Sequence, residues 1–169
     1  MTPLPAALGG SGLVAWRLDQ ARFAATWDSG EGAYRYGGRW NGVGTRAVYC
    51  ALDPSTAILE VAVHKGFTAL DTAPHVLSGF EVKAPERIAI VRPEDVPNPN
   101  WLHPGTPGAG QQRFGDALLV RHGAFVIPSA VSTESWNLVF DAAIFVGAYR
   151  LMSQHRFALD TRLNPPPAT

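Results

Sequence analysis

The sequence predicts a single α+β domain, in which mixed or antiparallel strands pack with flanking helices. Its 169 residues are enough for one domain with a sizeable apolar core, and a second domain is not expected. Short apolar runs typical of strands mix irregularly with helical patterns, and no internal repeat is present. The 17 glycines and 14 prolines indicate a loop-rich chain.

Strand patterns dominate the first half of the chain. The expected strands cover residues 13–18, 46–51, 76–82 and 87–91. The clearest helix lies at 53–66, because Asp53 is a typical N-cap residue, Pro54 occupies the first helical position and Gly66 ends the pattern.

The second half opens with a long proline- and glycine-rich loop at 93–110. Such a loop in a compact domain is commonly functional or mobile, so we treat it as a lid or a flank of a site. The elements expected after it are a helix at 111–123, a strand at 124–131 interrupted at Pro128, an apolar stretch of undetermined type at 138–149, and a final strand at 156–163.

Residues 1–11 are mostly small and rich in proline and glycine, and the last residues, "NPPPAT", are similar. We expect disorder at 1–11 and 164–169, which leaves 12–163 as the folded domain. The N-terminal segment lacks a basic region followed by a long apolar one, and no apolar stretch reaches the roughly 20 residues of a membrane helix. A soluble, cytoplasmic protein that does not bind membranes is therefore expected.

Charge is scarce and balanced. Charged residues make up 17% of the chain and the formal net charge is zero, so the electrostatic footprint of a nucleic-acid or anionic-membrane binder is missing. A ribonuclease is disfavoured for the same reason. Because few charges are available for the surface, we expect a partner or a second copy to cover part of it, which implies a hetero-oligomer or a homodimer.

Cysteine and histidine patterns predict no metal site and no internal disulfide. Cys50 is the only cysteine, and its position at the end of an apolar strand is typical of a buried thiol. The histidines lack ligand spacing; they are His64, His75, His103, His122 and His155.

Glu60 is the most informative single residue. It is the only charged side chain between Asp53 and Lys65, and its neighbours in the helix are apolar. A glutamate in this setting either lies at the solvent edge or pairs with an arginine for structure. The alternative is a carboxylate that points into a cleft, where it could stabilise developing positive charge.

Arg17 and Arg39 are the next candidates. Arg39, Trp40 and Asn41 lie within the glycine-rich segment 37–44, where the backbone can approach a ligand closely. The planar guanidinium group binds phosphate oxygens in pairs, although the segment matches neither the dinucleotide fingerprint nor the P-loop. We expect Trp40 to anchor the segment in the core.

Two further side chains have both a structural and a functional interpretation. Tyr49 ends a strand just before the Glu60 helix and is either a core aromatic or a surface on which a flat ring stacks. Ser129 follows Pro128 without the glycines of a hydrolase nucleophile elbow, so it is a turn serine or a hydrogen-bonding partner of a phosphate or ribose.

Together these motifs resemble the RES domain, the toxin half of Xre-RES toxin-antitoxin modules. The resemblance covers nearly the whole folded chain and is carried by "WRL" at 16–18, "GEGAYRYGGRWNGVGTRAVYCALDPSTAILEVAVHKG" at 30–66, "GD" at 115–116, "VIPSAV" at 126–131 and "FALDTRL" at 157–163. The arginine, glutamate and serine that name the family correspond to Arg39, Glu60 and Ser129.

The resemblance implies an α+β fold akin to ADP-ribosyltransferases and an enzyme that consumes NAD as a substrate, not as a cofactor. Members break NAD at the nicotinamide-ribose bond with water or phosphate as acceptor, or transfer ADP-ribose to a protein. It also implies a cognate Xre-family helix-turn-helix antitoxin that covers the pocket, so that the toxin itself touches no DNA. A non-catalytic domain that only binds a nucleotide or a protein is the remaining alternative.

The same resemblance implies roles for the candidate residues. Glu60, Arg39 and Tyr49 form the catalytic group, in which Glu60 stabilises the oxocarbenium ion as nicotinamide leaves. Substrate binding is assigned to Arg17, Asn41 and Ser129. The segment after Ser129 departs from the family pattern, because "ESWNLVFDAAIFVG" contains Asn137 without a following proline and histidine.

Overall fold

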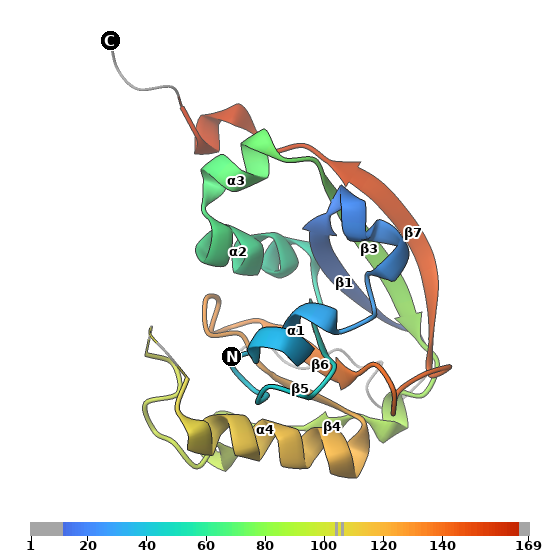
Figure 1. The fold of residues 1–169 in the computed structure, drawn as a ribbon, viewed down its shortest axis with the longest axis vertical. Helices are drawn as coiled ribbons and strands as arrows, with labels where there is room; N and C mark the ends of the chain where they lie inside the picture. Colours follow the sequence, from blue (N-terminus) through green and yellow to red (C-terminus); the bar gives the residue numbers. More distant parts are fainter. Residues whose placement is uncertain (1–11, 104, 106, 166–169) are drawn as a thin grey trace.

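A seven-stranded sheet organises the domain in a computed structural model that describes residues 12–103, 105 and 107–165 (Figure 1). The strand order is β4-β5-β6-β2-β1-β3-β7. Among the described strands only β4 and β5 pair in parallel, so the sheet is mixed, as the sequence predicts. The strands are β1 Leu13–Gln20, β2 Ala47–Ala51, β3 His75–Val82, β4 Ala89–Ile90, β5 Ala124–Pro128, β6 Trp136–Asp141 and β7 Tyr149–Phe157.

Helices flank the sheet, as the α+β class requires. The α-helices are α1 Glu31–Tyr36, α2 Pro54–Lys65, α3 Phe67–Thr72 and α4 Ala109–His122. Short 3-10 helices lie at Ala21–Thr26, Pro85–Arg87, Pro93–Asp95 and Thr161–Leu163. In Figure 1, α2 and α3 lie beside the β1-β3-β7 side, and α4 lies beside the β4-β5-β6 side.

The sheet is weakly joined in its middle. β1 pairs with β3 over eight residue positions, whereas β1 and β2 share only the pair Trp16 and Ala51. Beyond that pair the two strands separate, and α2 contacts both of them. The separation leaves room for a cleft between the two halves of the sheet.

One apolar cluster spans both halves of the sheet, because it joins side chains of β1 and β3 with side chains of β2, β5 and β6. Aromatic rings fill this cluster, in which Tyr149 packs against Trp27, Phe80, Phe140 and Phe145. In a second cluster, Leu119 of α4 and the loop residues Val96 and Trp101 pack with side chains of β5 and β6, and buried Trp40 belongs to this cluster. Trp40 therefore anchors the glycine-rich segment, as expected.

Local signals set the ends of α2. The carboxylate of Asp53 accepts a hydrogen bond from the backbone N–H of Thr56 at 2.8 Å, and Pro54 occupies the first turn. Gly66 has φ = 79° and ends the helix, since this conformation favours glycine. The predicted helix at 53–66 is thus confirmed.

The C-terminal strand differs from the prediction at 156–163. The last strand is β7, which ends at Phe157, and residues Thr161–Leu163 form a 3-10 turn. The Asp160 side chain accepts a hydrogen bond from the Arg162 backbone N–H at 3.0 Å, which stabilises the turn rather than an extended chain. The apolar stretch of undetermined type, 138–149, is the end of β6, a turn and the start of β7.

The predicted N-terminal disorder at 1–11, and residues 166–169 of the predicted C-terminal disorder, lie outside the described residues. Within the described residues, the helices are too short and too polar to cross a membrane.

Candidate active site

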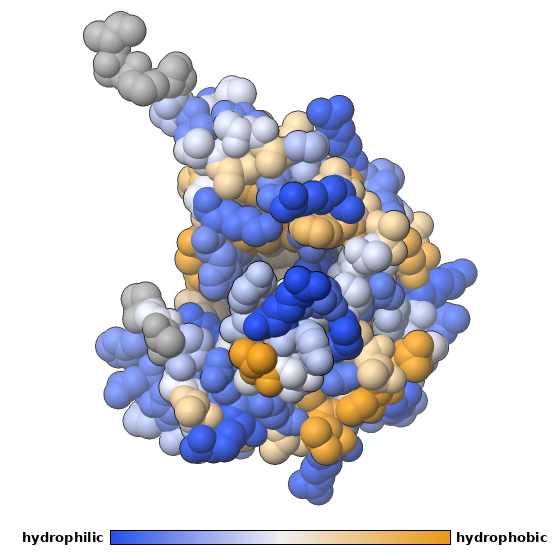
Figure 2. Space-filling model, in the orientation of Figure 1, coloured by the Kyte–Doolittle hydropathy of each residue, from blue (hydrophilic) through white to orange (hydrophobic). Residues whose placement is uncertain are grey.

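A cleft of about 310 Å³ opens where β1 and β2 separate, a volume typical of small-molecule sites. Its walls come from β1, β2, α2, the 37–40 segment and the start of β6. On the face shown in Figure 2 the surface is hollowed between the α2 and α1 regions. Four of the predicted site residues line the cleft: Arg17, Arg39, Tyr49 and Glu60.

Two side-chain donors hold the carboxylate of Glu60. Its Oε1 accepts hydrogen bonds from Ser129 Oγ at 2.8 Å and from Asn137 Nδ2 at 2.5 Å. Its Oε2 lies 3.8 Å from His64 Nε2, and the side chain is 22% exposed. Within the described part of the chain, the Glu60 carboxylate contacts a hydroxyl, an amide and a histidine. It does not form the structural ion pair with an arginine that was one of the two expectations.

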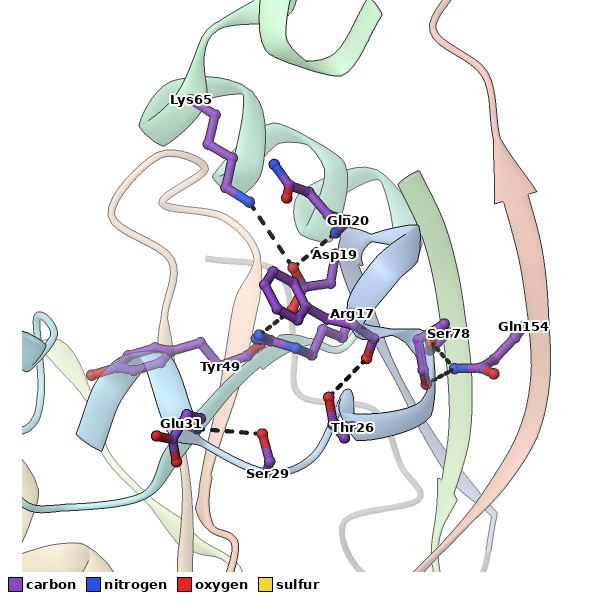
Figure 3. A network of polar contacts seen from close by, with 12 residues as sticks. Arg17, Asp19, Gln20, Thr26, Ser29, Glu31, Tyr49, Lys65, Ser78 and Gln154 are labelled. Carbon is purple, nitrogen blue, oxygen red and sulfur yellow. Dashed lines mark hydrogen bonds and ion pairs between the residues drawn. The ribbon is translucent and has the colours of Figure 1, made fainter. Parts of the chain in front are cut away.

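Arg17 spans the gap between the separated strands. Its Nη1 donates to the backbone carbonyl of Tyr49 at 2.8 Å, and its Nη2 bonds Asp19 at 2.7 Å (Figure 3). Lys65 lies 4.0 Å from the same Asp19 carboxylate. Arg17 Nε is buried and has no hydrogen-bond partner among the described residues.

Arg39 connects the cleft to the long loop. Its Nη1 donates to the Trp101 carbonyl at 2.8 Å, and Trp101 packs on Trp40 with ring centroids 5.6 Å apart. Trp101 is only 4% exposed. This part of the 93–110 loop therefore forms a flank of the site in the structure.

The Tyr49 hydroxyl is fully engaged with the protein. It donates to Asn41 Oδ1 at 2.6 Å and accepts from the Trp40 backbone N–H at 3.0 Å. Burial raises the pKa of the phenol well above its usual value, so the group stays protonated. The ring, which lines the cleft, is what Tyr49 can offer a ligand.

Asn41 and Ser129 lie behind the cleft wall. Both are completely buried, and neither lines the cleft. Asn41 holds the Tyr49 hydroxyl, while Ser129 holds Glu60 and accepts from the backbone N–H groups of Val131 and Ser132. The structure thus places these two residues as supports of the lining residues.

Sequence reasoning did not assign site roles to Asn137, Asp19 and His64. The signal for His64 is its position four residues after Glu60, which places both on one face of α2. Asn137 is the asparagine of the family pattern after Ser129, but its contact with Glu60 arises only through the tertiary fold.

The site gives little support for metal binding or for a cysteine nucleophile. Within the described residues, no three His, Cys, Asp or Glu side chains gather as metal ligands. Burial raises the pKa of the Cys50 thiol to about 12, so it is not a ready nucleophile. The cleft's charged lining combines Arg17, Arg39, Lys65, Asp19 and Glu60, which suits a ligand that carries both phosphate and hydroxyl groups.

Comparison with known proteins identifies the family. Residues 14–160 match the RES domain. "Toxin Res" of Photorhabdus laumondii is 31% identical over 155 residues, covering 89% of this chain and 97% of that protein. "Toxin Res" of Yersinia enterocolitica is 35% identical and covers 89% and 99%. "Prs ADP-ribosylating toxin" of Sphingobium sp. is 30% identical and covers 76% and 81%.

A solved structure shares the fold. The chain aligns with the crystal structure of the M. tuberculosis MbcT-MbcA toxin-antitoxin complex with a TM-score of 0.70 and 23% identity, covering 87% of this chain and 85% of that one. The resemblance read from the sequence motifs is confirmed by the domain match and by relatives above 30% identity. This chain belongs to the RES domain family.

Proposed function

We propose that the protein is the toxin of a toxin-antitoxin module and cleaves the nicotinamide-ribose bond of NAD with water or phosphate as acceptor. The observation that carries the proposal is the presence, in one cleft, of a held carboxylate, two arginines and an aromatic ring. The names of the relatives from Photorhabdus and Yersinia support the toxin assignment.

The chemistry follows from the charges. When the bond between nicotinamide and ribose breaks, nicotinamide leaves as a neutral molecule and the ribose carbon gains oxocarbenium character. The Glu60 carboxylate would stabilise that positive charge and bind the ribose hydroxyls. Water then adds to the carbon and releases one proton, or phosphate adds and yields the phosphorylated sugar.

The remaining lining residues would bind and orient the dinucleotide. Arg39 and Arg17 suit the pyrophosphate, since each guanidinium group has N–H groups beyond those used within the protein. The Tyr49 ring would stack near the nicotinamide, because its hydroxyl is already engaged.

An antitoxin partner is part of the proposal. The structural neighbour was solved as a toxin-antitoxin complex, which supports a cognate antitoxin here. We propose a helix-turn-helix antitoxin of the Xre family that covers the cleft, with the toxin acting in the cytoplasm. The exposed apolar side chains around the domain are consistent with such a covered surface.

Transfer of ADP-ribose to a protein is the second candidate. The relative from Sphingobium is named as an ADP-ribosylating toxin, and both reactions begin with the same loss of nicotinamide. Cleavage releases ADP-ribose or its phosphorylated form, whereas transfer leaves ADP-ribose attached to a protein.

The test is an incubation of antitoxin-free protein with NAD, with and without inorganic phosphate, followed by mass analysis. Free nicotinamide together with ADP-ribose, or with its phosphorylated form, would support cleavage and name the acceptor. Intact NAD would overturn it, and labelled NAD in cell extract would then distinguish protein modification from a domain that only binds.

Glu60→Gln tests whether the negative charge of the Glu60 carboxylate is needed for cleavage. Gln keeps the shape and can still accept from Ser129 and Asn137, but it lacks the negative charge, so we expect nicotinamide release to fall roughly a hundredfold or more. Glu81→Gln is the control, because Glu81 pairs with Arg150 away from the cleft. A folded Glu60→Gln variant with full activity would contradict the assignment.

A further inference from the structure

We propose that Trp101 is a positioning residue for substrate binding. Its buried ring fixes the loop whose backbone carbonyl orients the Arg39 guanidinium group for the pyrophosphate of the dinucleotide. The inference rests on the role of Arg39 in the proposed function. It gives the 93–110 loop a task at the site, because the sequence motifs assign no residue of that loop.

Arg39 lines the cleft and is held there by a neutral partner. Its Nη1 donates to the backbone carbonyl of Trp101 at 2.8 Å. Among the described residues, no Asp or Glu side chain forms an ion pair with Arg39. A carbonyl oxygen fixes the guanidinium group without placing a formal negative charge beside it. The positive charge therefore stays available to a phosphate group.

The other arginine of the cleft is held differently. Arg17 donates to the Asp19 carboxylate at 2.7 Å and to the Tyr49 carbonyl at 2.8 Å, and both partners lie on strands of the sheet (Figure 3). The partner of Arg39 lies 62 positions further along the chain, in a loop. A loop carbonyl can orient a side chain only where the loop itself is fixed.

The Trp101 side chain supplies that fixation. It is 4% exposed, and its ring packs on Trp40 with the centroids 5.6 Å apart. Its backbone N–H donates to the Asn98 carbonyl at 3.1 Å, which closes a turn around the residue. Trp40 follows Arg39 directly in the chain, so the ring of Trp101 holds its own carbonyl against the segment that carries the guanidinium group.

Phe114 of α4 provides a matched comparison. Its ring also packs on Trp40, with centroids 6.5 Å apart, and it belongs to the same apolar cluster. Its side chain has no polar atom and offers Arg39 no hydrogen bond. Phe114→Ala therefore removes an aromatic contact with Trp40 and leaves the hydrogen bond from Arg39 to the Trp101 carbonyl in place.

The experiment measures the Kd of ADP-ribose and of adenosine by calorimetry. Trp101→Ala should weaken ADP-ribose binding roughly tenfold, because the guanidinium group is no longer oriented before the ligand binds. Adenosine binding should be unchanged, since adenosine has no pyrophosphate. Trp101→Phe keeps an aromatic ring and should restore the affinity for ADP-ribose. Phe114→Ala should lower the Tm and leave both Kd values close to wild type.

A double variant tests whether Trp101 acts through Arg39. Arg39→Ala should weaken ADP-ribose binding, and adding Trp101→Ala should weaken it no further, because the group that Trp101 orients is already gone. Trp101→Leu fills part of the same space and gives the same comparison where the alanine variant does not fold, with a smaller loss of affinity.

Two results would overturn the inference and leave the proposed function intact. One is wild-type affinity for ADP-ribose in folded Trp101→Ala or Trp101→Leu. The other is an undiminished effect of the Trp101 substitution in the Arg39→Ala background, which would show that Trp101 acts independently of the guanidinium group. Conversely, ADP-ribose binding that depends on Trp101 in a protein that releases no nicotinamide from NAD would support the inference and overturn the proposed cleavage.

Discussion

At the scale of single residues, the site consists of lining side chains held by buried ones. The Tyr49 hydroxyl forms hydrogen bonds to Asn41 and to the backbone of Trp40, so the residue is tied to the glycine-rich segment that carries Arg39. The ring of Tyr49 lines the cleft, whereas its hydroxyl stabilises the fold through hydrogen bonds. A Tyr49→Phe substitution separates the two roles, because it removes the hydroxyl and keeps the ring.

Tyr49→Phe should destabilise the fold by about 1–3 kcal/mol, because the buried Asn41 Oδ1 and Trp40 N–H would each lose a partner. Since the ring remains, the KM for NAD should change little. Urea unfolding and steady-state kinetics measure the two quantities. Tyr36→Phe is the control, because Tyr36 is 82% exposed. A large rise in KM without loss of stability would show instead that the hydroxyl serves the ligand.

Sequence patterns identify the lining residues better than the supporting ones. Glu60 stands out as a charge on an apolar helix, and Arg39 stands out among glycines, so local sequence suffices to select them. Asn137 lies 77 positions from Glu60 and meets it only once β2 and β6 have paired. Nothing within a few residues of Asn137 marks that contact.

At the scale of elements, the Arg39 segment is held by the close approach of α4. A Cβ added to Gly115 would collide with the carbonyl oxygen of Trp40. Gly115 is therefore the position at which the helix backbone can lie directly against the segment. The carboxylate of Asp116 adds a hydrogen bond to the Gly42 N–H at 3.0 Å.

Gly115→Ala should destabilise the protein, although alanine in a helix interior normally stabilises by roughly 0.5–1 kcal/mol. The collision with backbone cannot be relieved by a flexible side chain, so we expect a loss of about 1–3 kcal/mol and lower activity as the Arg39 segment shifts. Among the described residues, the Cβ of Gly110→Ala in the same helix meets only the far end of Arg113, so this substitution should be neutral or stabilising. Equal effects of the two substitutions in thermal unfolding would contradict this packing.

The elements differ in how far the sequence predicts them, for physical reasons. The helix α2 carries its own start and stop signals in Asp53, Pro54 and Gly66, so its bounds follow from local rules. The edge strand β7 is exposed at most of its positions and lacks the alternation of a half-buried strand. The length of β7 is set by its pairing with β3, and the local sequence pattern does not predict that pairing.

At the scale of the whole molecule, the cleft lies between two halves of one sheet. β1 and β2 share a single residue pair, and the Arg17 side chain crosses the gap to the Tyr49 carbonyl. A dinucleotide in the cleft would contact Arg17 on one half and Arg39 and Tyr49 on the other. Ligand binding should therefore stabilise the domain as a unit rather than order one loop.

This arrangement predicts a thermal shift with ADP-ribose, which avoids turnover because it lacks nicotinamide. At a ligand concentration of about 100 Kd, mass action adds about 2.7 kcal/mol to the free energy of unfolding. For a domain of this size, that corresponds to a rise in Tm of roughly 5–10 °C. Adenosine, which lacks the pyrophosphate, should give a much smaller shift at the same concentration.

Because the pyrophosphate is assigned to both arginines, Arg39→Ala should reduce the ADP-ribose shift while leaving the response to adenosine unchanged. Equal shifts with the two ligands would place the binding energy in the shared adenosine part and contradict the assignment of Arg17 and Arg39.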